Sequence, residues 1–183
     1  MNILLYCKNS NKHIGINMGR SMIITLDLQR FTLSNLFFLD MKRNIIMDGN
    51  FTKLIYSNDC FTMNGLYILF PIENNGVERI MNKTQVKFNP YSPHNLQIVQ
   101  DFSKLEVKIL EYYRQSRQCG RKISNLLSKQ MYVGFMKIHR DSYDMSNELK
   151  KNVQYVIKIS GVWETRDEIG LTYKLYEVSE VYL

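Results

Sequence analysis

The chain has one long segment with helical periodicity, and strand-like segments flank it on both sides. After Ser92, apolar residues recur every three or four positions: Ile98, Phe102, Leu105, Ile109 and Tyr113. Ser92 suits the N-cap, Pro93 suits the first helical position, and Gly120 follows the last periodic residues. We therefore predict a helix over about 93–118, inserted between two groups of strands.

The residues before this helix alternate between apolar and polar. Four stretches predict strands: ILLY (3–6), SMIITLDLQ (21–29), FTKLIYS (51–57) and FTMNGLYILFPI (61–72). A tight turn at 58–60 would join the last two, and Gly65 predicts a bulge or bend of the kind that curls a sheet toward a barrel. A turn at 74–76 precedes one more predicted strand, VERIMNKTQVKF (77–88).

The residues after the long helix predict a short helix and further strands. We expect the short helix at about 122–129. Three segments rich in Val, Ile and Tyr then predict strands: 131–140, 152–163 and 171–183. The polar stretch 141–151 predicts an exposed hairpin loop between the first two of them.

This order of elements predicts one α+β, β-rich domain over residues 1–183, because no linker or repeat divides the chain. We expect an antiparallel sheet or an oligonucleotide-binding (OB-like) barrel, with the long helix inserted between strands, and the barrel is the most economical single architecture. The strand number exceeds five, so such a barrel would be elaborated. The alternative is a β-sandwich with a helical insertion.

The positive charge of the chain is concentrated in one region. Lys and Arg total 24 against 17 acidic residues, which gives a net charge of +7. The segment from Tyr112 to Arg140 contains seven of these basic residues and no Asp or Glu. A local basic field favours a polyanion such as nucleic acid or the acidic face of a protein, although a solvated helix surface has the same composition.

The residues that carry common enzyme chemistry do not form recognisable motifs. The three cysteines and three histidines lie in unrelated segments without the spacing of metal ligands. The chain contains no phosphate-binding glycine loop and no nucleophile elbow. We therefore expect a protein that is not an enzyme and that uses no metal or other cofactor.

Basic and aromatic residues adjoin one another in several predicted strands. Single-stranded nucleic acid is bound by a positive groove together with aromatic rings on which bases stack. The candidate binding residues are Lys53, Tyr56, Lys87, Arg114, Arg117, Arg121, Lys122, Lys129, Tyr132, Phe135, Lys137, Arg140, Trp163 and Lys174. Each ring has an alternative role in the core. Trp163 in particular either plugs one end of a barrel or stacks a base at the mouth of a groove.

The hydropathy of the chain predicts a soluble protein. No apolar run approaches the roughly 18 residues that span a bilayer. The N-terminal stretch lacks the charge pattern and cleavage site of a signal peptide. We expect an intracellular protein without a membrane partner.

Two stretches carry a resemblance to known proteins: IMDGNFTKLIYSNDCFTMNGLYILFPI (46–72) and YVIKISGVWETRDEIGLTYKL (155–175). They resemble a small protein family of nucleocytoplasmic large DNA viruses, of the giant-virus type. The resemblance implies a viral setting in the host cytoplasm, the nucleus or the virion. Such viruses also carry divergent barrel-type proteins that bind single-stranded DNA, although the phage versions end in an acidic tail and this chain ends in YEVSEVYL.

These observations lead to two functional hypotheses. The first is a nucleic-acid-binding protein, for single-stranded DNA rather than RNA, that acts without catalysis. The alternative is a viral structural or assembly protein whose basic face docks on a viral protein or on the genome. Exposed strand edges could also pair between two copies of the chain, which would give a homodimer.

Overall fold

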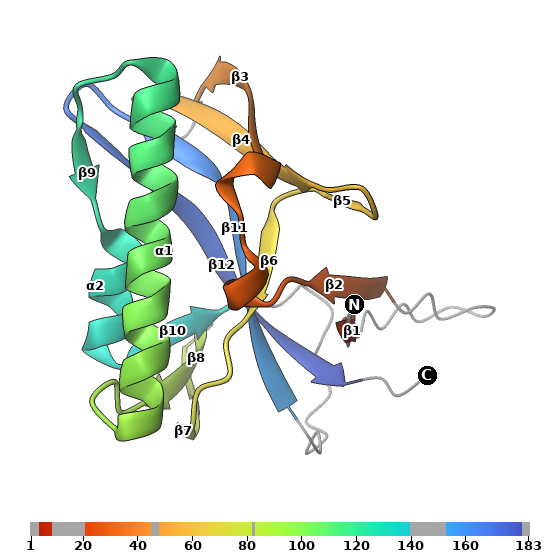
Figure 1. Ribbon diagram of the computed structural model, residues 1–183. Helices are drawn as coiled ribbons and strands as arrows, with labels where there is room; N and C mark the ends of the chain where they lie inside the picture. Colours follow the sequence, from red (N-terminus) through yellow and green to blue (C-terminus); the bar gives the residue numbers. More distant parts are fainter. Residues whose placement is uncertain (1–3, 9–20, 45–47, 82, 140–152, 181–183) are drawn as a thin grey trace.

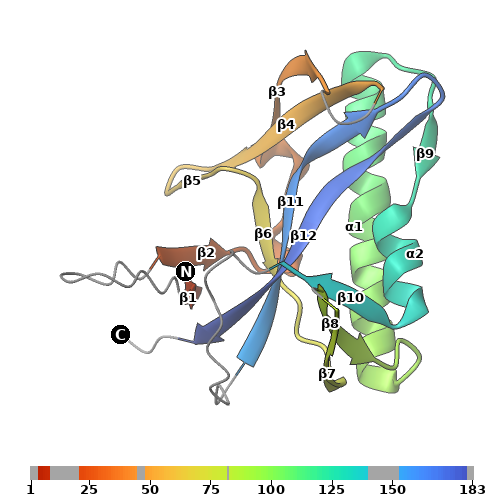
Figure 2. The ribbon, with the colours of Figure 1, turned by 180° about the vertical axis from the view of Figure 1, so that it is seen from behind.

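One large sheet carries two helices on the same side, as the computed structural model of the chain shows (Figure 1). The structure describes residues 4–8, 21–44, 48–81, 83–139 and 153–180. Figure 2, seen from behind, again shows α1 (Pro93–Arg117) and α2 (Leu126–Val133) together beside the central strands. The predicted α+β, β-rich class is confirmed.

The strands vary from two to thirteen residues in length. Before α1 the strands are β1 (Leu4–Lys8), β2 (Ser21–Thr25), β3 (Leu36–Arg43), β4 (Asn50–Ser57), β5 (Thr62–Met63), β6 (Leu66–Leu69), β7 (Asn74–Ile80) and β8 (Lys83–Phe88). After α1 they are β9 (Lys122–Ser124), β10 (Phe135–Ile138), β11 (Val153–Glu164) and β12 (Glu168–Glu180). Two short 3-10 helices, η1 (Leu28–Arg30) and η2 (Leu33–Asn35), connect β2 to β3.

The long hairpin of β11 and β12 forms the centre of the sheet. Its register runs from Val153 opposite Ser179 to Glu164 opposite Ile169, with an irregularity between residues 159 and 161. The main strand order is β3-β4-β11-β12-β10-β8-β7, so β3 and β7 are its two ends among the described strands. The sheet is open and mostly antiparallel, with α1 inserted between its strands, so the sheet form of the prediction is confirmed, whereas the OB-like barrel and the β-sandwich are wrong. The physical reason is that α1 and α2 cover the apolar side of the sheet, so that side is buried without closure or a second sheet.

The long helix forms where its periodicity predicts it. Its buried side includes Val99, Phe102, Leu105, Ile109 and Tyr113, all at most 3% exposed. The Ser92 hydroxyl accepts a hydrogen bond from the amide of the third helical residue, and proline occupies the first turn. The helix ends at Gln118, which takes the left-handed conformation with φ of 50°. This end lies two residues before the glycine that the sequence indicated.

The short helix forms four residues later than predicted, because a distant carboxylate caps it. Residues 122–124 form β9, parallel to β12, and α2 begins only at Leu126. Its N-cap residue, Asn125, makes no capping hydrogen bond with its side chain. Glu106 of α1 is fully buried and accepts hydrogen bonds from the amides of Leu127 (2.9 Å) and Ser128 (2.8 Å) and from the Ser128 hydroxyl. A tertiary contact therefore satisfies the amides that a local cap would normally bind.

Two predicted strands have different boundaries in the structure. The stretch 77–88 is a hairpin of β7 and β8, with Met81 in the left-handed region at φ 53°. The predicted turn at 74–76 lies inside β7, where the register shifts between Asn74 and Gly76. The stretch 131–140 begins in α2, and only its second half forms a strand. In contrast, the bend predicted at Gly65 is confirmed by its φ of 99° between β5 and β6.

Two more of the predicted features concern membrane-spanning segments and the loop at 141–151. None of the helices in the described residues is long and apolar enough to cross a membrane. The predicted loop at 141–151 lies outside the described residues.

Candidate nucleic-acid interface

Three lysines form a row across neighbouring strands on the sheet face that points away from the helices. Lys158 of β11 lies directly opposite Lys174 of β12. On the other side of β12, β10 runs parallel with Ile138 beside Leu175. Ile138 and Leu175 are buried in the core, so the preceding residues, Lys137 and Lys174, project from the opposite face. We call Lys137, Lys158 and Lys174 the lysine row, and this side of the sheet the outer face.

The lysine row concentrates like charge without a carboxylate to balance it. In the described part of the chain, no acidic side chain forms an ion pair with any of the three lysines. The Lys158 ammonium lies 4.9 Å from the centre of the Tyr67 ring, and Lys174 Nζ lies 3.2 Å from Nε2 of His139. Like charges directly opposite one another destabilise a sheet. The row is therefore a site where a bound anion would relieve repulsion.

Phe135 and Lys87 extend the outer face toward β8. They are cross-strand partners on β10 and β8, and Phe135 is 38% exposed. Lys87 Nζ lies 2.7 Å from Oε1 of Glu78 on β7. Lys87 thus has an acidic partner, whereas the three lysines of the row have none among the residues that the structure describes.

Trp163 and Lys53 lie at the other end of the outer face, beyond the irregularity in β11. Trp163 pairs with Phe51 of β4, and Lys53 pairs with Gly161. Thr52 lies between Phe51 and Lys53 and is fully buried on the helix side, so its two neighbours project outward. The outer face therefore brings together six of the predicted residues: Lys53, Lys87, Phe135, Lys137, Trp163 and Lys174.

Three of the predicted arginines, Arg114, Arg117 and Arg121, have acceptors within the protein. Arg114 Nη2 lies 2.7 Å from Oε2 of Glu111, one turn earlier in α1. Arg117 donates a hydrogen bond of 2.7 Å to the carbonyl oxygen of Leu39 in β3. These contacts tie the end of α1 to itself and to the edge of the sheet, away from the outer face.

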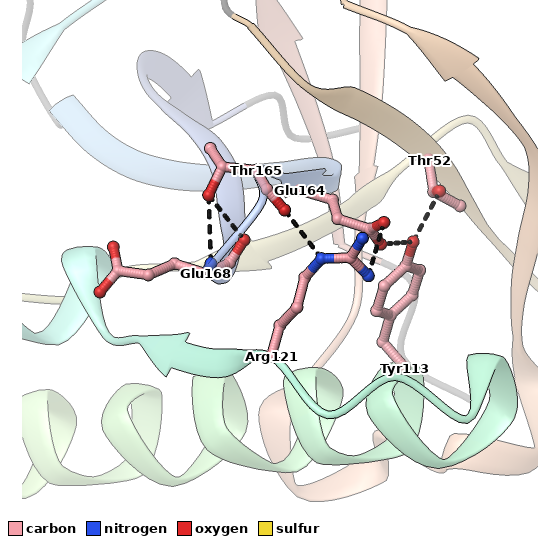
Figure 3. A network of polar contacts seen from close by, with 6 residues as sticks. All are labelled: Thr52, Tyr113, Arg121, Glu164, Thr165 and Glu168. Carbon is pink, nitrogen blue, oxygen red and sulfur yellow. Dashed lines mark hydrogen bonds and ion pairs between the residues drawn. The ribbon is translucent and has the colours of Figure 1, made fainter.

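Arg121 belongs to a buried polar network between α1 and the sheet (Figure 3). Its Nη1 lies 2.9 Å from Oε1 of Glu164, and its Nε donates to the carbonyl of Thr165 at 2.8 Å. The Tyr113 hydroxyl donates to the other Glu164 oxygen at 3.0 Å and lies 2.9 Å from Oγ1 of Thr52. Burial raises the pKa of Tyr113 above 10.0, and Glu164 raises it further while the Thr52 hydrogen bond opposes the shift. Arg121 therefore balances a carboxylate that is only 6% exposed.

The remaining predicted residues lie apart from the outer-face group. Tyr56 is a core residue, 1% exposed, so its ring is not accessible to a base. Lys129 and Tyr132 are exposed on α2, on the other side of the sheet, and Lys122 lies on β9. Arg140 lies outside the described residues.

A second titratable tyrosine lies where β12 meets α2. The Tyr173 hydroxyl lies 3.5 Å from the carbonyl oxygen of Leu126, to which it donates. Burial raises the pKa of Tyr173 to about 12, and the negative charge of Glu106 adds to the shift. Tyr173 faces the helices, so it takes no part in the outer face.

A cavity of about 720 Å³ lies between η1, α1 and the end of β6. Its lining includes apolar side chains and charged residues of both signs: Asp27, Arg30, Asp101, Lys104 and Lys108. Lys104 Nζ lies 3.5 Å from Asp101, and Lys108 Nζ lies 5.6 Å from the centre of the Phe31 ring. Two carboxylates therefore lie among the three cations of this cavity, so its positive charge is less concentrated than that of the lysine row.

Comparisons with other proteins provide no family for the chain. Protein-family models, curated proteins and solved structures were searched, and none of them matches. Within the described residues, no group of three His, Cys, Asp or Glu side chains could hold a metal ion. The resemblance to proteins of large DNA viruses stays a prediction.

Sequence reasoning missed several residues of the outer face. Lys158 was not selected, although it lies within the alternating run from Tyr155 to Ile159 and so had to face away from the buried isoleucines. Lys42 and Phe51 were also missed, because their neighbours across the sheet depend on the register of β3, β4 and β11. The alternation of the strand could have identified Lys158, but only the pairing of the strands identifies Lys42 and Phe51.

Proposed function

We propose that the protein is a non-enzymatic nucleic-acid-binding protein and that single-stranded DNA lies across its outer face. The proposal includes an intracellular and viral setting, without a membrane partner. The observation that carries it is the lysine row, in which Lys158 opposes Lys174 with Lys137 on the next strand and no carboxylate is paired with them in the described residues.

Electrostatics supports a polyanion as the ligand. Neighbouring strands lie about 4.8 Å apart, so the three ammonium groups of adjacent strands can contact a chain of phosphates in succession. Phosphates would neutralise the cations and release their own counterions, which is the main source of affinity in such complexes. The aromatic side chains on the same face, Phe135 and Trp163, favour a strand whose bases are unpaired.

Salt dependence of binding tests this function. Fluorescence anisotropy of a labelled oligothymidine would be measured at increasing salt concentration. If about three phosphates are neutralised, the logarithm of the association constant falls with a slope of about −2 against the logarithm of salt concentration. A duplex of equal length is the comparison and should bind more weakly. Undetectable binding at low salt, or affinity that does not depend on salt, would contradict the proposal.

A viral assembly protein is the second candidate, and one apolar surface favours it. β3 is an edge strand, and Phe37, Leu39 and Met41 on it are 40 to 49% exposed. Exposed apolar side chains on a strand edge are typical of surfaces that pair with another chain. Under this alternative the protein would self-associate or bind a viral protein, and Met41→Lys would weaken that association. Sedimentation velocity over a range of protein concentrations distinguishes the two, because the first candidate requires no self-association.

A further inference from the structure

Two aromatic rings on the outer face lie over glycines of neighbouring strands. Trp163 and Phe51 are register partners on β11 and β4. A Cβ atom at Gly170 would lie 2.3 Å from Cζ2 and 2.6 Å from Cε2 of Trp163, so the indole occupies the space above that glycine. A Cβ at Gly161 would likewise lie 2.6 Å from Cζ of Phe51. We call Trp163 and Phe51 the aromatic platform.

The aromatic platform differs from the aromatic residues of the core in its exposure and its neighbours. Both rings are half-buried, whereas Tyr56 and Tyr113 are at most 1% exposed. Each ring covers the backbone of the adjacent strand, which fixes its position on the sheet. A partly exposed ring fixed in this way has little conformational entropy to lose when a planar group stacks on it.

Two lysines flank the platform. Lys42 of β3 is the register partner of Phe51, and Lys53 lies two residues along β4 on the same face. Both are exposed, and neither is ion-paired with an acidic side chain in the described residues. Two cations beside a pair of fixed rings match a nucleotide, which joins a planar base to a phosphate.

We propose that the aromatic platform is a base-stacking subsite, and that Lys42 and Lys53 bind the phosphates beside the stacked base. This inference rests on the proposed function. Trp163 and Lys158 are five residues apart on β11, a distance of about 16 Å along a strand. A single strand a few nucleotides long could therefore contact the platform and the lysine row together.

The platform gives a specific role to unpaired bases. A phosphodiester chain without bases would bind the lysine row but gain nothing from the rings. Loss of one base stack weakens binding roughly fivefold to 150-fold. Removal of the Trp163 ring should therefore lower affinity for oligothymidine by at least about fivefold and leave affinity for an abasic strand unchanged.

Trp163 is the only tryptophan of the chain, so its fluorescence reports on the platform directly. The experiment titrates the full chain with oligothymidine and with an abasic phosphodiester strand of the same length. We expect oligothymidine to quench the emission, while the abasic strand binds in an anisotropy competition assay without quenching. Trp163→Leu and Phe51→Leu are then compared with Tyr91→Leu, a matched control that removes a ring 66% exposed near α2.

The outcomes separate the platform from the proposed function. Selective loss of oligothymidine affinity in either platform variant, with unchanged circular dichroism and an unchanged control, supports the subsite. If the Trp163 variant does not fold, the oligothymidine affinity of the Phe51 variant alone tests the subsite. Equal binding of both strands without quenching would overturn the platform and leave the proposed function standing. If neither strand binds, both the base-stacking subsite and the proposed function are overturned.

Discussion

The two sides of the sheet use positive charge in different ways. On the helix side, Arg114 and Arg121 pair with carboxylates, and Arg117 donates to a backbone carbonyl of β3. On the outer face, the lysine row has no acidic partner among the described residues. The basic residues of this chain therefore divide into structural cations and cations available to a ligand, and the division does not follow the basic run 112–140, since Lys158 and Lys174 lie outside it. Removing a structural cation should lower the free energy of unfolding, and removing a cation of the lysine row should lower the affinity for DNA.

The largest expected effect is on the helix side, at Arg121. Arg121→Gln would leave Glu164 buried without its ion pair, so the free energy of unfolding should fall by about 3 kcal/mol. Urea denaturation followed by circular dichroism measures this change. Arg114→Gln is the control, because its pair with Glu111 is exposed and should contribute less than about 1 kcal/mol. An equal loss of unfolding free energy in the two variants would contradict a structural role specific to Arg121.

The second effect is on the outer face, and it concerns binding. The double variant Lys158→Gln and Lys174→Gln should weaken oligothymidine binding about tenfold at low salt, and it should reduce the magnitude of the salt slope by about 1.4. Lys104→Gln with Lys129→Gln removes the same charge from the helix side and serves as the control. Fluorescence anisotropy at several salt concentrations measures both the oligothymidine affinity and the salt slope. An equal loss in the control would mean that net charge, rather than the lysine row, determines affinity.

A smaller effect is expected from Tyr173 at alkaline pH. The unfolded chain ionises this tyrosine near pH 10, whereas the folded protein retains the proton until about pH 12. The unfolded state therefore binds fewer protons in this window, and the free energy of unfolding falls as pH rises from 10 to 12. Solvent screening of the partly exposed ring limits the loss from Tyr173 to at most about 1 kcal/mol. Tyr173→Phe should flatten the profile, and an unchanged slope would contradict the assignment.

The smallest effect concerns the stability of the lysine row itself. Lys174→Gln removes a repulsion with Lys158, so the free energy of unfolding should rise by about 0.5 kcal/mol. The same denaturation assay at low salt detects this gain, which added salt should diminish. A loss of stability would mean that the Lys174 contact with His139 supports the fold more than the repulsion opposes it.

The sequence predicted the elements that depend on local periodicity. The long helix, the strand class and the bend at Gly65 all follow from the spacing of apolar residues and from glycine chemistry. The start of α2 could not be predicted, because Glu106 caps it from another helix. The sequence did not decide between an open sheet and a closed barrel, since closure depends on which side the helices cover. For the candidate site, alternation places Lys137 and Lys174 outward, but only the register brings Lys158 opposite Lys174.

Lysine footprinting with and without oligothymidine tests whether DNA binds across the lysine row. The protein would be acetylated in both states, and the modification of each lysine would be quantified by mass spectrometry. We expect that bound DNA protects Lys137, Lys158 and Lys174, while Lys104 and Lys129 on the helix side stay reactive. Protection of Lys104 and Lys129 instead, or equal reactivity of all five lysines in a saturated complex, would contradict it.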